Sequence, residues 1–275
     1  MKKLVSIFLA LCLMACLAAL PLAAPESGNT YAPPANLNEL SQAEQLAYFN
    51  LAVNRVRAQR PGFAQRERLR IDSVRSSILG GIADGIINSI VKDRMPGGWE
   101  QQTIAAGRDN TGQFLSKNAN ASDLSMQDIT AISSTKIGDN WDIMINIAES
   151  VNPAAGTACS MGHIAPIATR EQIADELNPI GAFVEPVNIN LRYHSGYARV
   201  TVNPEGKVIS ATTGYQVHAQ ATGVSISILR GDITAEQTSE WQYDAFDWNI
   251  PWYFNLPSWL QWILRYIFFG WIWMQ

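Results

Sequence analysis

The stretch YARVTVNPEGKVISATTGYQVH (197–218) decides the fold. Polar and apolar residues alternate over 197–202 and again over 207–221, and a period of two is typical of half-buried β-strands. Between these runs, NPEG (203–206) contains the residue types of a tight turn. Gly214 inside the second run predicts a β-bulge. The stretch therefore predicts an antiparallel hairpin.

Further alternating runs flank this hairpin. Residues 141–147 and 187–194 precede it, and 224–230 and 233–246 follow, with a turn predicted at Gly231-Asp232. A helix is predicted at 169–177, and a short helical turn at 125–132. At least five strands joined by short connections, with one apolar face, predict an antiparallel meander.

Two helices are predicted before the sheet. Ser41 and Glu44 have the spacing of a capping box, and apolar residues recur at helical spacing to about residue 58. A second helix is predicted at 73–94, where Gly81 and Gly85 form a small-residue face for close packing. The expected fold class is α+β: an N-terminal helical hairpin on a curved antiparallel sheet, in one domain over 39–246.

The N-terminal 24 residues have the features of a signal peptide. Lys2 and Lys3 precede an apolar run that ends in small residues. LMAC (13–16) resembles a lipoprotein box, so Cys16 is a candidate for lipidation. A linker rich in Pro and Asn follows at 25–38. The sequence therefore predicts an exported protein located at the cell membrane or cell surface, on the extracytoplasmic side.

The segment 247–275 is predicted to associate with a membrane, because LPSWLQWILRYIFFGWIWMQ (256–275) has a single charge, Arg265. As a helix, 257–275 would be about 28 Å long, close to the ~30 Å of a bilayer core. Ser258, Gln261 and Arg265 share one face, which favours an interfacial helix or short hairpin. A transmembrane span and a helix docked on its own domain remain alternatives. The predicted membrane-associating residues are Trp259, Trp262, Arg265, Phe268, Phe269, Trp271 and Trp273.

Composition excludes some classes of function. The formal net charge is −4, and removal of Lys2 and Lys3 with the leader makes it about −6, which argues against nucleic-acid binding. Charged residues make up 16%, below the ~25% of ordinary soluble domains. A surface partly covered by membrane, wall or partner fits this value. Three cysteines, two of them in the leader, provide no disulfide framework.

An arginine-rich region follows the first predicted helix. Its local positive charge predicts a contact with anionic lipid or acidic wall polymer, and a solvated basic loop and edge strand is the alternative. The candidate contact residues are Arg55, Arg57, Arg60, Arg66, Arg68 and Arg70, with Arg75 nearby.

Catalytic motifs are not found. Cys159 and His163 lie four positions apart, as in a nucleophile pair or half of a metal site, but Gly162 and the preceding Pro-Ala-Gly run favour a loop. His194 and His218 fall on neighbouring predicted strands without carboxylates or cysteines that would complete a metal site. We therefore assign no catalytic residue, metal or cofactor.

Four stretches carry a resemblance to a protein group: NLAVNRVRAQRPGF (50–63), the Ile/Gly helix after it, LSMQDITA (124–131) and 197–218. Over about 39–246 they resemble uncharacterised secreted proteins of Gram-positive gut-type bacteria, in which two helices precede a curved antiparallel sheet. The resemblance implies an α+β fold and a cell-surface location, and it implies no activity.

These observations predict a membrane-attached extracytoplasmic protein with a non-enzymatic binding or structural role at the cell envelope. The expected partners are membrane lipid and either a wall polymer or another surface protein, without nucleic acid. Two alternatives stay open. One is a carrier of lipid or another apolar ligand in a half-barrel-like sheet, and the other is an envelope hydrolase that uses Cys159 and His163.

Overall fold

The computed structural model describes residues 31–77, 97–108, 114–115, 124–154, 159–177, 182–226 and 229–250. The predicted signal peptide, residues 78–94 of the second predicted helix, and 251–275 of the tail lie outside these ranges. None of the helices in the described ranges has the length and apolar character needed to cross a membrane.

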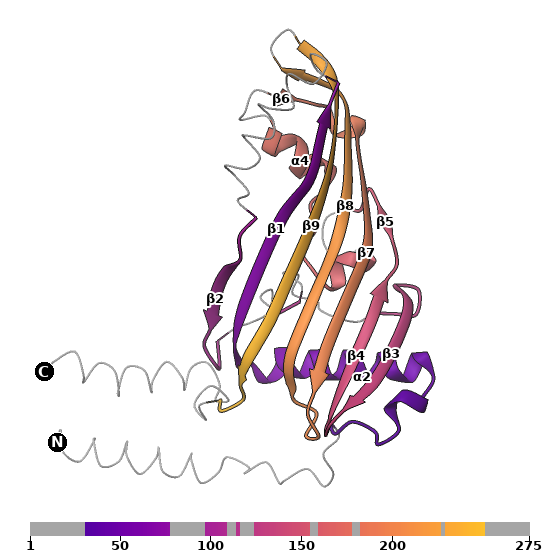
Figure 1. Cartoon of the computed structure of the whole chain (residues 1–275), viewed down its shortest axis with the longest axis vertical. Coiled ribbons are helices and arrows are strands. Elements are labelled where there is room, and N and C mark those ends of the chain that lie inside the picture. Colours follow the sequence, from indigo (N-terminus) through magenta and orange to yellow (C-terminus); the bar gives the residue numbers. More distant parts are fainter. Residues whose placement is uncertain are drawn as a thin grey trace, which may run out of the picture.

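One antiparallel sheet of nine strands forms most of the structure (Figure 1). Its main path runs β2-β1-β9-β8-β7-β4-β3, so the strands from β3 to β9 form a meander and β1 adds to its last strand. The short strands β5 and β6 pair with β7 and β8. The strands are β1 (Gly62–Ser76), β2 (Glu100–Ile104), β3 (Ile129–Ile137), β4 (Asn140–Ile147), β5 (Ser150–Val151), β6 (Ala182–Phe183), β7 (Ile189–Val202), β8 (Val208–Ile226) and β9 (Leu229–Asp247).

The hairpin predicted from 197–218 is confirmed as β7 and β8. Its turn closes through a bond from the Asn203 N–H to the Lys207 carbonyl, 2.9 Å long. Gly206 has a φ of +71°, and a β-carbon there would collide with the backbone of Tyr31, so this turn requires glycine. The predicted bulge lies on the neighbouring strand: the register shifts between His194 and Tyr197 of β7, whereas Gly214 stays paired on both sides.

The first predicted helix is confirmed as α2 (Gln42–Gln59). The Ser41 hydroxyl accepts a bond from the Glu44 N–H, and the Glu44 carboxylate accepts one from the Ser41 N–H, which is the predicted capping box. Phe49 and Val53, on the apolar side of this helix, are fully buried. In Figure 1, α2 crosses the strands near one end of the sheet, and α4 (Arg170–Leu177) lies toward the other end.

Four sequence predictions need correction. Residues 73–76 continue β1 instead of starting a helix. The predicted helical turn at 125–132 is a turn over 126–128 followed by β3. Gly231 and Asp232 lie inside β9, which begins at Leu229. Residues 187–188 belong to the short 3-10 helix η5 (Pro186–Asn188), and the strand begins at Ile189.

The sheet has two chemically different faces. The inner face packs against α2 and the segment 159–177: Ser134 of β3 donates to Gln45 of α2, and Tyr215 of β8 donates to the Pro166 carbonyl. The outer face carries the alternate side chains of the same strands. Both described α-helices contact the inner face, so the described elements leave the outer face open to solvent.

Candidate functional site

The outer face is polar along its length. On β9, Ser239, Trp241 and Tyr243 are buried on the inner face, and the residues between them point outward. Outward positions of β8 and β7 carry similarly polar side chains, in register with those of β9. These outer residues include Thr238, Glu240, Gln242 and Asp244 of β9, Thr212, Gln216 and His218 of β8, and Tyr197, Arg199 and Thr201 of β7.

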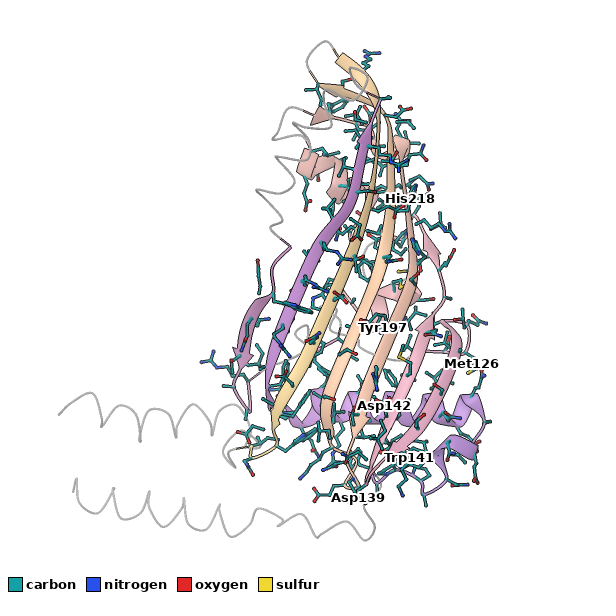
Figure 2. The ribbon with its side chains drawn as sticks, in the orientation of Figure 1. Met126, Asp139, Trp141, Asp142, Tyr197 and His218 are labelled. Atoms are coloured by element: carbon teal, nitrogen blue, oxygen red, sulfur yellow. The ribbon has the colours of Figure 1, made fainter. Side chains whose placement is uncertain are left out.

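Tyr197 lies near the middle of this face (Figure 2). A β-carbon at Gly214 on β8 would lie 3.0 Å from the Tyr197 ring, so glycine allows the ring to rest on the neighbouring strand. Tyr197 is half-buried, and its pKa is raised by burial and by the charge of Glu240, while Arg68 lowers it. Its ring is therefore held against the sheet, and part of the residue stays exposed to solvent.

Arg68 of β1 connects this tyrosine to a second aromatic residue. Its guanidinium forms an ion pair with Glu240 of β9, with Nε 2.9 Å from the carboxylate oxygen. The same guanidinium lies 4.6 Å from the centre of the Trp99 ring, a cation–π contact. Trp99 keeps 39% of its surface exposed. We call Tyr197, Glu240, Arg68 and Trp99 the aromatic row, because they extend across the sheet from β7, over Gly214 of β8, to β9, β1 and the residue before β2.

Polar pairs lie on either side of the aromatic row (Figure 2). Toward α2, the buried Asp142 accepts a bond from Arg199 Nε at 2.8 Å and one from the Thr201 hydroxyl at 3.3 Å. The hydrogen bond that Arg199 donates to Asp142, together with the charge of that carboxylate, raises the pKa of Arg199. Toward the opposite end, His218 pairs with Glu236 through Nδ1. These pairs fix outward side chains in place, so the face presents ordered donors and acceptors.

The arginine cluster predicted from the sequence is divided between two environments. Arg55 and Arg57 are buried, and Arg57 donates to the Phe114 carbonyl at 3.0 Å. Arg60 ends α2 with a φ of +54°. On the outer face, Arg66 pairs with Asp244 at 2.8 Å, and Arg68 pairs with Glu240. Arg70 pairs with Asp72 at 2.7 Å. Each of these three arginines of β1 is therefore already paired with a carboxylate.

Cys159 and His163 lie at the two ends of the short 3-10 helix η3 (Ser160–His163), with Cys159 as its N-cap. Within the described residues no hydrogen bond joins them, and His163 Nδ1 is buried without a hydrogen-bond partner. The nearby carboxylate is Asp128, which accepts bonds from the Ser125 and Ser160 hydroxyls at 2.6 and 2.8 Å. Partial burial raises the pKa of Asp128, but these bonds and the charge of His163 lower it overall.

The predicted membrane-associating residues, Trp259 to Trp273, lie outside the described residues. The described part of the chain holds no cluster of three or more His, Cys, Asp or Glu side chains placed to bind a metal ion. Sequence reasoning missed the aromatic row. Tyr197, Arg199 and Thr201 occupy alternate positions of one strand, so their side chains lie on the same face. The two polar residues were the signal that the Tyr197 ring points outward. Nothing in the sequence around Trp99 indicates its contact with Arg68.

Comparisons with protein-family models, with curated proteins and with solved structures found no match to this chain.

Proposed function

We propose that this protein is an exported, membrane-attached binding protein of the cell envelope, which holds a wall polymer on the outer face without catalysis. The aromatic row is the observation that carries the proposal. It places an exposed tryptophan and a half-buried tyrosine on either side of an ion pair, on a face that the described helices leave open.

The chemistry of this row suits a hydroxyl-rich and amide-rich polymer. Aromatic rings offer apolar faces to the C–H surfaces of sugar rings, and Tyr and Trp contribute large contact areas at low conformational cost. Neighbouring Thr, Gln and Glu side chains can exchange hydrogen bonds with hydroxyl and amide groups. The pairing of Arg66, Arg68 and Arg70 with carboxylates favours this uncharged type of recognition over binding through net positive charge.

The proposed binding can be tested by cosedimentation with insoluble peptidoglycan. The wild-type protein should sediment with the polymer, and the double variant Tyr197→Ala/Trp99→Ala should bind at least about tenfold more weakly. Phe183→Ala is the matched control, because Phe183 is an aromatic residue 53% exposed on β6, away from the aromatic row. A wild-type protein that does not sediment, or equal binding by all three proteins, would overturn the proposed ligand.

Membrane attachment through the tail needs a separate test. Burying half of the apolar area of the tail at ~25 cal/mol per Å² is worth roughly 10 kcal/mol before ordering costs, so attachment should resist salt. Cells would express the full chain and a chain truncated after Phe254, both carrying Cys16→Ser, for fractionation in concentrated salt. The full chain should stay with membranes and the truncated chain should leave. Identical partitioning would show that the tail is not the anchor.

A further inference from the structure

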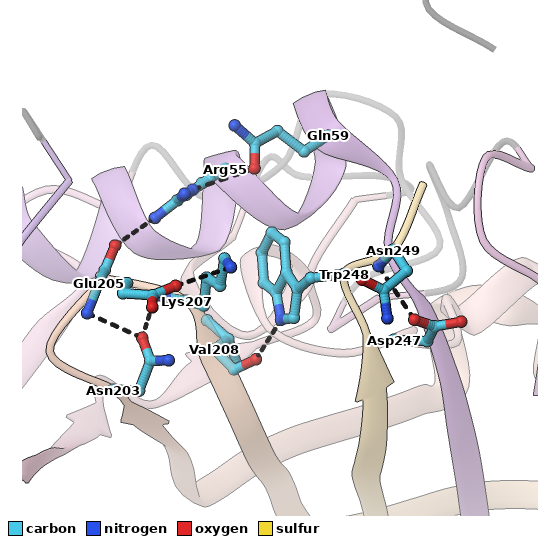
Figure 3. A network of polar contacts seen from close by, with 9 residues as sticks. All are labelled: Arg55, Gln59, Asn203, Glu205, Lys207, Val208, Asp247, Trp248 and Asn249. Carbon is cyan, nitrogen blue, oxygen red and sulfur yellow. Dashed lines mark hydrogen bonds and ion pairs between the residues drawn. The ribbon is translucent and has the colours of Figure 1, made fainter. Parts of the chain in front are cut away.

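The two ends of the described domain meet at one side chain, Arg55 of α2. Its guanidinium lies 4.4 Å from the centre of the Tyr31 ring and 5.4 Å from that of Trp248. Arg55 also donates to the Glu205 carbonyl at 2.6 Å and to the Gln59 side chain at 3.1 Å (Figure 3). The buried guanidinium of Arg55 therefore contacts the N-terminal end of the described domain, its C-terminal end and the β7–β8 turn.

Both ends have further attachments at this place. The Tyr48 hydroxyl donates to the Tyr31 carbonyl at 2.9 Å, and Tyr31 packs against Gly206 of the turn. The Trp248 indole N–H donates to the Val208 carbonyl at 3.0 Å, at the start of β8 (Figure 3). These contacts fix the positions of Tyr31 and Trp248, which lie at or near the first and last residues that the structure describes.

The connection between the described domain and the hydrophobic tail is short compared with the length of the sheet. Leu256, the first residue of the hydrophobic tail, lies six positions after Ile250, and even a fully extended connection reaches only about 20 Å. β8 has 19 residues, so its ends are roughly 60 Å apart at ~3.3 Å per residue. A membrane-inserted tail would therefore hold the Arg55 end close to the lipid and leave the far end of β8 distant.

We infer that the Arg55 end of the domain faces the lipid bilayer, so that the long strands point away from the membrane. We call this end the membrane-proximal rim; it comprises the β7–β8 turn (203–206), the β3–β4 turn at Gly138 and Asp139, and the end of β9. The inference rests on the proposed membrane attachment. It adds an orientation, in which the sheet stands on the bilayer and the outer face is exposed above it.

The charges of the membrane-proximal rim agree with this orientation. Glu205 pairs with Lys207 at 2.7 Å beside the turn, so a carboxylate near the lipid is accompanied by a cation (Figure 3). Arg60 and Lys136 add positive charge near the same end of the strands, against Asp139 and Asp247. This mixed charge lets the rim approach zwitterionic or anionic headgroups without strong repulsion.

Energy transfer to the membrane surface can measure the orientation. Donor dyes would be introduced through an unnatural amino acid at exposed Asp139 on the rim or at exposed Thr222 near the far end of β8, in the otherwise unchanged full chain. Vesicles of phosphatidylcholine with a small fraction of acceptor-labelled lipid provide the surface. Transfer should be high from position 139 and at least several-fold lower from position 222, because transfer falls steeply over tens of ångströms.

Flotation of the same samples separates the two hypotheses. Vesicle-bound protein with equal transfer from both positions, or stronger transfer from position 222, would overturn the orientation while leaving membrane attachment intact. Protein that does not float with the vesicles would overturn the proposed attachment and the orientation with it. Bound protein with strong transfer from position 139 alone would support both.

Discussion

Tyr197 lies across Gly214 so closely that a β-carbon at Gly214 would stand 3.0 Å from Cε1 of the tyrosine ring. The same β-carbon would stand 2.8 Å from the Ser239 carbonyl oxygen on β9, closer than real β-carbons come to other atoms. The aromatic row therefore depends on the absence of a side chain at one position of the central strand.

Gly214→Ala should lower the free energy of unfolding by about 1–3 kcal/mol, because the backbone of β9 or the Tyr197 ring must move. Chemical denaturation monitored by circular dichroism would measure the loss. Gly98→Ala is the control, since a β-carbon at Gly98 meets nothing within 4 Å, and it should change stability by less than about 0.5 kcal/mol. Equal stabilities of the two variants would contradict the close contact.

Arg55→Met should destabilise the domain by about 2.5–5 kcal/mol. The substitution keeps an apolar stem in place but removes a charged hydrogen bond to Glu205, worth ~1.5–3 kcal/mol, and two cation–π contacts of ~0.5–1 kcal/mol each. Arg75→Met, at an exposed position of β1, is the control. If Arg55→Met loses no more stability than Arg75→Met, the contacts of Arg55 with Tyr31, Trp248 and Glu205 do not stabilise the domain.

Asp128→Asn should reduce stability at neutral pH by about 1 kcal/mol, because the charged oxygens accept three bonds from Ser125 and Ser160 in a partly exposed position. Since the folded-state pKa of Asp128 is lowered, its contribution is present above the unfolded-state pKa of ~3.9 and is lost as pH falls through the folded-state value. The stability curves of the variant and the wild type should therefore converge below about pH 4. A constant difference down to pH 2 would contradict this. Asp139→Asn, in an exposed turn, controls for the change in net charge.

Tyr193→Phe tests the attachment of segment 159–177 to the inner face. The Tyr193 hydroxyl donates to the Ala168 carbonyl at 2.7 Å and accepts from the Ala168 N–H at 3.1 Å, so its removal should cost about 1–2 kcal/mol at neutral pH.

The same variant should change the alkaline limb of the stability curve. Burial raises the pKa of Tyr193 to about 12, so its contribution is complete below the unfolded-state pKa of ~10 and is lost as pH rises toward 12. Tyr193→Phe should therefore lose less stability than the wild type over this range. An unchanged slope between pH 10 and 12 would contradict the buried position of this hydroxyl.

The sequence predicted the elements whose buried sides are apolar. α2 followed from its capping box and its apolar spacing, and β4, β7 and β8 followed from alternation, because Ile143, Ala198 and Val217 bury apolar surface. β1 was not predicted as a long strand, since its inward positions include Gln65 and Glu67. Gln65 is buried and accepts a bond from Gln102 of β2. A buried polar side chain of this kind gives no hydropathy signal.

β3 was missed for a similar reason. Its inward Ser134 is buried and donates to Gln45 of α2, 89 positions away. The aromatic row was also beyond sequence reasoning, because its four residues meet only through the register of β7, β8, β9 and β1. Sequence patterns indicate which way a side chain points along one strand, but they do not show which residue lies opposite it.

The pairing of β1 with β9 has a consequence for how the chain folds. The ion pair between Arg66 and Asp244 joins residues 178 positions apart, and the two strands are paired from Gly62 to Ser76 with two shifts in register. Because synthesis proceeds from the N-terminus, β1 is made long before its central partner exists. Such non-local pairing makes folding slow and leaves an unpaired strand edge exposed in the meantime. The sheet is complete only after β9 has been synthesised and has paired with β1 and β8. An incomplete chain would therefore leave the edges of β1 and β8 free to associate wrongly.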